Sequence, residues 1–258
     1  MRDLYRPLYI IETPILFTSR QSSELIKYAA NTFLATKITF INEIADLCEV
    51  VDADVHDVAR GIGLDGRIGK KFLHAGPGYG GSCFPKDTRA LVSTAQQSGS
   101  PLQIVETVVK LNEDRKRKMA VRVIDAAGGS LEGKTVAVLG LTFKPNTDDM
   151  RESPSLDIVP ALIEAGAKVR AYDPEGMVEA KAMLNGVEWC DDAYATMPDA
   201  DVLLLITEWN QFRALDLKRV KSLMRAPLMV DLRNVYEPKT MREQGFVYHC
   251  IGRPRKIS

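Results

Sequence analysis

The fold class follows from Thr135-Val-Ala-Val-Leu-Gly140, an apolar β-type segment that ends in glycine. Four similar segments come after it, and helical patterns separate them at residues 155–166, 175–184 and 217–224. Apolar strands that alternate with helices are typical of an α/β fold, in which both faces of a parallel sheet are covered. We therefore predict a Rossmann-like parallel-sheet domain, with strands at residues 135–141, 168–173, 201–207, 228–232 and 246–251.

The residues after the first strand do not continue as a dinucleotide-binding turn. Gly140 is followed by Leu-Thr-Phe143-Lys144-Pro, which lacks the second and third glycines of GxGxxG. Those glycines let the backbone approach a pyrophosphate, so the usual NAD-binding geometry is not expected here. Lys144 can attract phosphate and Phe143 can stack on a ligand, but a core phenylalanine beside a surface lysine fits the sequence equally well.

The residues before the sheet predict an all-helical region. Residues 15–60 contain neither glycine nor proline, and their apolar positions recur at helical spacing. This pattern predicts a long helix at about 22–50, capped by Ser22 or Ser23. Two long helices in one region favour dimerisation, so we expect a homodimer. The other expected helices are a short one at 54–60, one that begins near Pro85, and a long one at 101–127.

Composition excludes several classes of protein. The 258 residues carry 34 basic and 34 acidic side chains, a balance that argues against nucleic-acid or anionic-membrane partners. No window reaches the roughly 18 apolar residues that a membrane span needs, and the start does not resemble a signal peptide. The four cysteines form no CxxC pair and the three histidines show no ligand spacing, so no metal site is expected. We expect a cytoplasmic protein.

The most informative stretch for chemistry is Gly76-Pro-Gly-Tyr-Gly-Gly-Ser-Cys83-Phe-Pro-Lys-Asp87. Its glycines let the backbone approach a ligand, and Pro85 places Cys83 at the start of a helix, where the reactive thiolate is favoured. Asp87 lies one helical turn further on, where it can activate water or hold a lysine. The other three cysteines lie in apolar segments and are expected to be inert core residues.

Lys27 and Asn31 form a second candidate group. They are four residues apart on the predicted long helix and so share one face. Two solvated surface residues would fit the same spacing, and nothing in the spacing brings this face to Cys83.

Four stretches together resemble the UDP-glucose/GDP-mannose dehydrogenase family, over residues 1–252. The resemblance is closest to the branch that oxidises UDP-glucose. The stretches are Ser23-Glu-Leu-Ile-Lys27-Tyr-Ala-Ala-Asn31-Thr-Phe-Leu, Arg67-Ile-Gly-Lys-Lys-Phe72, Gly80-Gly-Ser-Cys83-Phe-Pro-Lys86-Asp87 and Gly140-Leu-Thr-Phe143-Lys144-Pro-Asn-Thr-Asp-Asp-Met-Arg151-Glu-Ser-Pro.

The resemblance implies an NAD-dependent, two-step oxidation of UDP-glucose to UDP-glucuronate. Cys83 would attack the intermediate aldehyde to give a thiohemiacetal, which hydride loss converts into a thioester that water hydrolyses. Lys27 and Asn31 would stabilise the oxyanion, and Asp87 would order or deprotonate the water. Lys86 and Arg151 would touch the cofactor. The residues implied for the substrate are Arg67 from a neighbouring subunit, Phe72, Tyr79, Gly80, Phe84, Phe143, Lys144 and Arg233.

The resemblance also implies a division into domains. Residues 1–20 would be an extended remnant of an NAD-binding domain, with a buried strand at 15–18. Residues 21–130 would form the central helical dimerisation domain with Cys83, and residues 131–258 the UDP-sugar-binding domain. Because the GxGxxG domain of the family is absent, we expect no turnover by this polypeptide alone.

Three alternatives stay open at this level. The chain can act on another nucleotide sugar, such as GDP-mannose or a UDP-N-acetylhexosamine. It can be a catalytically silent, dimeric module that binds a nucleotide sugar. It can also be a partly unfolded remnant with an exposed apolar face.

Overall fold

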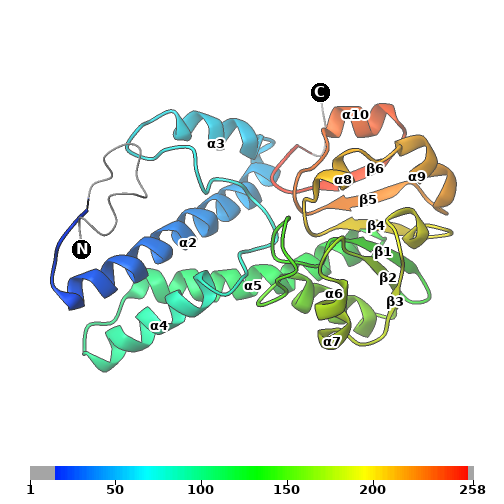
Figure 1. Cartoon of the computed structure of the whole chain (residues 1–258). Coiled ribbons are helices and arrows are strands. Elements are labelled where there is room, and N and C mark those ends of the chain that lie inside the picture. Colours follow the sequence, from blue (N-terminus) through cyan, green and yellow to red (C-terminus); the bar gives the residue numbers. More distant parts are fainter. Residues whose placement is uncertain (1–14, 255–258) are drawn as a thin grey trace.

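The structure is a computed structural model that describes residues 15–254 (Figure 1). Its first part is helical: the long helix α2 (Arg20–Val51) packs against α4 (Phe84–Gln97) and α5 (Gln103–Ala126), and the short helix α3 (Val55–Gly63) lies beside the end of α2. These helices confirm the predicted helical region. None of the described helices is long and apolar enough to cross a bilayer.

The second part is a six-stranded sheet in the order β3-β2-β1-β4-β5-β6, and every neighbouring pair is parallel. This is the Rossmann strand order, which confirms the predicted fold class. The strands are β1 (Thr135–Leu139), β2 (Lys168–Tyr172), β3 (Val187–Trp189), β4 (Val202–Leu205), β5 (Leu228–Asp231) and β6 (Val247–Cys250).

Helices cover both faces of the sheet. Residues at alternating positions of β1 point to opposite faces: Val136 and Val138 belong to one core, and Ala137 and Leu139 to another. The first core includes residues of α2, α5 and α6 (Ser155–Glu164), so the helical part and the sheet share one apolar interior. The remaining helices are α7 (Met177–Met183), α8 (Asn210–Arg213), α9 (Leu217–Leu223), α10 (Pro238–Glu243) and the 3₁₀ turn η2 (Tyr194–Thr196).

Two local predictions are wrong. Residues 15–18 form no strand: they lie in irregular backbone, with Leu16 and Phe17 exposed, because all six strands of the sheet come from residues 135–250. The rest of the predicted fragment, residues 1–14, lies outside the described residues. The cap of α2 is Ser19, whose hydroxyl accepts a hydrogen bond from the Ser22 N–H at 3.2 Å, so Ser22 is already inside the helix.

Candidate functional site

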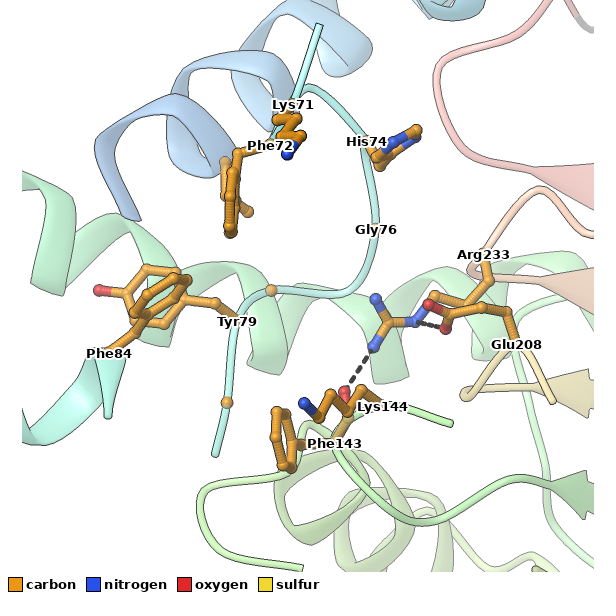
Figure 2. A pocket seen from close by; sticks show the side chains of 13 residues that line it. Lys71, Phe72, His74, Gly76, Tyr79, Phe84, Phe143, Lys144, Glu208 and Arg233 are labelled. Carbon is orange, nitrogen blue, oxygen red and sulfur yellow. Dashed lines mark hydrogen bonds and ion pairs between the residues drawn. The ribbon is translucent and has the colours of Figure 1, made fainter. Parts of the chain in front are cut away.

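A pocket of about 400 Å³ lies where the helical part meets the carboxyl ends of the strands (Figure 2). The stretch 71–80 forms one wall, and residues that follow β1, β4 and β5 form the opposite wall. Ligands bind at the carboxyl ends of the strands in open parallel sheets, so this is the position that the fold favours for a site. The pocket is lined by Ile38, Lys71, Phe72, His74, Gly76, Gly78, Tyr79, Gly80, Phe84, Phe143, Lys144, Glu208 and Arg233.

The glycine-rich wall is held from behind by buried polar side chains. The Gly76 N–H donates to Asn42 Oδ1 at 2.9 Å, and the Gly76 carbonyl accepts from Arg115 Nε at 2.6 Å. Asn112 accepts from the Tyr79 N–H at 2.8 Å and donates to the Tyr79 carbonyl at 3.1 Å. Because these bonds satisfy backbone groups that have no strand or helix partner, they fix the shape of the wall.

Glycine at positions 80 and 81 permits close contact between the cysteine loop and the sheet. A Cβ atom on Gly80 would lie 2.3 Å from the Glu152 carbonyl oxygen, and one on Gly81 would lie 2.7 Å from the Phe143 ring. The Gly81 N–H also donates to the Arg151 carbonyl at 2.8 Å. The two glycines therefore serve contact between chain segments, in addition to the approach to a ligand that the sequence suggested.

Cys83 is the N-cap residue of α4, with Pro85 in the first turn of that helix, as predicted. It is the exposed member of the four cysteines. The other three are buried, and burial raises the pKa of the thiols of Cys48 and Cys190 and brings that of Cys250 to about 12. An accessible thiol at a helix N-terminus is the arrangement that suits a nucleophile.

Lys27 and Asn31 do meet the helix that carries Cys83. Lys27 Nζ donates to Asn31 Oδ1 at 3.2 Å, and Asn31 Nδ2 donates to Asp87 Oδ2 at 2.5 Å. Lys86 Nζ donates to the other oxygen of Asp87 at 2.5 Å. Burial of Asp87 would raise its pKa, but the hydrogen bonds from Lys86 and Asn31 hold that pKa below its ordinary value. Asp87 thus binds the Lys86 ammonium group and the Asn31 amide one helical turn from Cys83, and Asn31 in turn binds Lys27.

The opposite wall presents cationic and aromatic groups. Arg233 is 16% exposed, and its Nε donates to the Ile206 carbonyl at 2.8 Å while its Nη2 donates to the Phe143 carbonyl at 3.2 Å. Lys144 is exposed beside the half-buried Phe143 ring (Figure 2). A wall with an arginine, a lysine and an aromatic face can hold a phosphate chain and a planar base.

Comparison with known proteins assigns both halves of the chain to domains of one protein family. Residues 21–114 match the central domain of the UDP-glucose/GDP-mannose dehydrogenase family, and residues 137–238 match the UDP binding domain of the same family. The chain belongs to this family. A UDP-glucose 6-dehydrogenase of Rhizobium meliloti (strain 1021) is 62% identical over 98% of this chain and 58% of that protein.

Solved structures of the dehydrogenase family agree with this assignment. A UDP-glucose dehydrogenase from the hyperthermophilic archaeon Pyrobaculum islandicum matches 96% of this chain and 54% of its own, with a TM-score of 0.84 and 37% identity. A UDP-D-ManNAc dehydrogenase from Pyrococcus horikoshii matches 98% and 56%, with a TM-score of 0.81 and 26% identity. The chain thus spans little more than half the length of these dehydrogenases.

Seven residues that the family resemblance implies are not among those that line the pocket: the candidate catalytic residues Lys27, Asn31, Cys83 and Asp87, and also Arg67, Lys86 and Arg151. Arg67 has a side chain that is 90% exposed and bonded to Asp65. Arg151 is 67% exposed and bonded to Asp149, and Lys86 is 68% exposed and bonded to Asp87. An arginine that serves a neighbouring subunit and side chains that touch a cofactor bound elsewhere would both be exposed in one isolated chain.

Sequence reasoning missed four residues of the pocket. Ile38 comes from α2, Lys71 and His74 flank Phe72, and Glu208 follows β4. Of these, only Glu208 had an available signal, because a polar residue directly after a central parallel strand lies at the ligand-binding edge of the sheet.

The turn after β1 does not fit the NAD that the dehydrogenase family implies. Asp173, which follows β2 and is fully buried, accepts from the Leu141 N–H at 2.6 Å and the Thr142 N–H at 3.1 Å. It also accepts from Trp209 Nε1 at 3.1 Å. In a dinucleotide-binding turn such N–H groups face the pyrophosphate. Here those N–H groups donate to the Asp173 carboxylate, so they are not available to the pyrophosphate of NAD.

Proposed function

We propose that this chain is the sugar-nucleotide-binding and nucleophile-bearing half of an NAD-dependent UDP-glucose 6-dehydrogenase, an oxidoreductase that forms UDP-glucuronate. The observation that carries the proposal is the pocket between the glycine-rich wall and Arg233, whose lining includes Phe84, the residue after the exposed Cys83. We also propose a division near residue 130, into a central helical domain and a UDP-sugar-binding domain. The exposed thiol of Cys83 suits the reducing cytoplasm.

The pocket has the groups that a UDP-sugar requires. Arg233 and Lys144 would bind the diphosphate, since a guanidinium can donate to two phosphate oxygens at once and an ammonium adds a point charge. Phe143 would pack on the uridine. The rings of Phe72 and Tyr79 lie 5.9 and 6.1 Å from the ring of Phe84, the residue after Cys83, so an aromatic cluster would form the wall beside the sugar.

Cys83 would react with the sugar after its C6 alcohol has been oxidised to an aldehyde. Its thiolate adds to C6, a C–S bond forms, and the carbonyl electron pair moves to oxygen. Lys27 Nζ and Asn31 Nδ2 would stabilise that oxyanion. Asp87 would take a proton from the water that later attacks the thioester, in which the C–S bond breaks and the thiolate leaves.

NAD would accept the hydride in both oxidations, and it must be held by residues other than those of the β1 turn. Lys86 and Arg151, exposed near Cys83, would contact it from this side. Because the N–H groups of the β1 turn already donate to Asp173, we expect the chain alone to bind UDP-glucose without producing NADH.

The exposed face of α2 supports a homodimer. Ile26, Phe33, Phe40 and Leu47 are about half exposed and recur every seven residues, the spacing of an apolar seam between paired helices. The loop that carries Arg67 is tied to α2 by Lys37, whose Nζ donates to the carbonyls of Ile68 and Gly69 at 2.9 and 3.2 Å. Arg67 would therefore lie close to the seam, from which it would reach the pocket of the partner.

A second candidate substrate is a UDP-N-acetylhexosamine. The likeness to the UDP-D-ManNAc dehydrogenase of Pyrococcus horikoshii favours it, because that protein shares the fold with a TM-score of 0.81. The uridine and diphosphate contacts would be unchanged, and only the sugar end of the pocket would differ.

Isothermal titration of the purified chain with UDP-glucose, UDP-N-acetylmannosamine, GDP-mannose and NAD tests the proposal. We expect UDP-glucose to bind and NAD not to bind. The K144A variant should bind UDP-glucose about tenfold more weakly, whereas K168A, at an exposed lysine of β2, should behave like the parent chain. Preference for GDP-mannose, or equal loss in both variants, would contradict the proposal.

A further inference from the structure

Arg233 is held along one edge of its guanidinium. Its Nε donates to the carbonyl of Ile206 at the end of β4, and its Nη2 donates to the carbonyl of Phe143. Within residues 15–254, the hydrogen bonds of the guanidinium come from Nε and Nη2, and Nη1 donates none. Nη1 lies close against Gly76, where a Cβ atom would be 3.2 Å away, and both residues line the pocket. One edge of the guanidinium is therefore anchored, and the other is available to a ligand.

Glu208 lies beside the anchored edge of the Arg233 guanidinium. It follows β4, lines the pocket, and brings its Oε2 atom to 3.1 Å from Arg233 Nε (Figure 2). Oε2 is buried and accepts no hydrogen bond from the described residues, so the contact is an ion pair that acts through charge. Glu208 is also the only carboxylate among the residues that line the pocket.

A carboxylate at this place is unfavourable for anion binding by itself. The two walls of the pocket otherwise carry Lys71, Lys144 and Arg233, and a negative charge among them weakens the attraction of a diphosphate. The geometry indicates that the carboxylate helps to hold Arg233 in place. Without Glu208, only the two carbonyl contacts would keep the long Arg233 side chain from turning toward solvent.

We propose that Glu208 is a positioning residue for the diphosphate site: it holds Arg233 so that the Nη1 edge faces the ligand. The inference rests on the proposed function, since it takes the ligand to be a nucleoside diphosphate or its sugar ester. It adds a residue that acts through Arg233 and does not touch the phosphates itself.

Two substitutions at Glu208 separate positioning from charge. In E208Q the side chain keeps its size and an oxygen beside Nε, so Arg233 stays in place, and the lost negative charge makes UDP bind at least as tightly as in the parent chain. In E208A nothing fills the space beside Nε, so UDP should bind about tenfold more weakly. A residue that only repels phosphate would predict tighter binding in both variants.

The experiment is calorimetric titration of the whole chain with UDP and with uridine. Uridine lacks phosphate, so its affinity should be the same in the parent chain, E208A and E208Q. In an R233A background, adding E208A should no longer weaken UDP binding, because the residue through which Glu208 acts is gone and the lost negative charge leaves the affinity equal or higher. The control is E188A, which removes an ion pair of the same length, 3.1 Å between Arg170 Nε and Glu188 Oε2, at the far edge of the sheet.

A readout without ligand keeps the inference separate from the proposed function. The Nε–H signal of Arg233 in the ¹H–¹⁵N spectrum, assigned by its loss in R233K, should exchange slowly with solvent in the parent chain and E208Q. It should exchange fast in E208A. Failure of the parent chain to bind UDP would sink the proposed function, while this signal would still decide the role of Glu208. An unchanged signal in E208A, or a loss of UDP affinity that persists in R233A, would overturn the inference.

Discussion

At the scale of single residues, Cys83 differs from the other cysteines in exposure and in its place at the start of α4. We predict that iodoacetamide modifies Cys83 in the folded chain and leaves Cys48, Cys190 and Cys250 unmodified, because burial keeps reagent away and raises the pKa of their thiols. Mass spectrometry of tryptic peptides measures this. Modification of all four at similar rates, as expected in urea, would contradict the structure.

The lowered pKa of Asp87 predicts that the stability of the fold depends on pH. Its pKa is below the ordinary value of about 3.9, so its contacts with Asn31 and Lys86 stabilise the fold fully above that value, and the stabilisation is lost as pH falls through the lowered pKa. The D87N variant should therefore unfold more easily than the parent chain at pH 7, with a difference that shrinks below about pH 4. Urea unfolding at pH 7, 5 and 3 tests this, and a difference that is constant with pH would refute it.

The residues of the candidate site were only partly predictable. Cys83 stood out because glycine, serine and charged residues flank it, whereas nothing in the spacing joined Lys27 and Asn31 to it. That link depends on the packing of α2 against α4, which places Asn31 beside Asp87 across 56 positions of sequence. His74 and Lys71 had no local signal, because a side chain that lines a pocket from irregular backbone follows no periodic pattern.

At the scale of elements, the loop before α4 depends on glycine at position 80. A Cβ atom in G80A would meet the Glu152 carbonyl at 2.3 Å, so either the loop or the turn at 152 has to move. We predict a loss of about 1–3 kcal/mol in the free energy of unfolding. The control is G66A, where a Cβ atom meets nothing within 4 Å. Equal stability of the two variants in urea would contradict the close contact.

Long elements were predicted better than short ones. The helices α2 and α5 and five strands were found from periodicity and apolar runs, whereas β3, α8 and α10 were missed. Strand β3 has three residues, which is too short for an alternating pattern, and only its pairing with β2 defines it. The cap of α2 was misplaced by three residues, because Ser19, Ser22 and Ser23 are all good caps and only the backbone distinguishes them.

At the scale of the whole molecule, the apolar seam on α2 predicts the oligomeric state. We expect a homodimer in sedimentation equilibrium, and F40E should weaken it by about 2 kcal/mol or more, because it puts a charge in the middle of the seam. V178E, at an exposed valine of α7, should leave the dimer unchanged. A monomeric parent chain at micromolar concentration would refute the dimer.

The central claim is that the pocket and Cys83 form one site for a UDP-sugar, and the alkylation rate of Cys83 tests it most directly. Iodoacetamide is added to the chain with increasing UDP-glucose, and modification of Cys83 is followed by mass spectrometry. We predict that UDP-glucose slows the reaction to a saturating limit, whereas glucose and GDP-mannose at the same concentrations do not. An unchanged rate at concentrations where calorimetry shows UDP-glucose to be bound would mean that the ligand sits away from Cys83, and the account would be wrong.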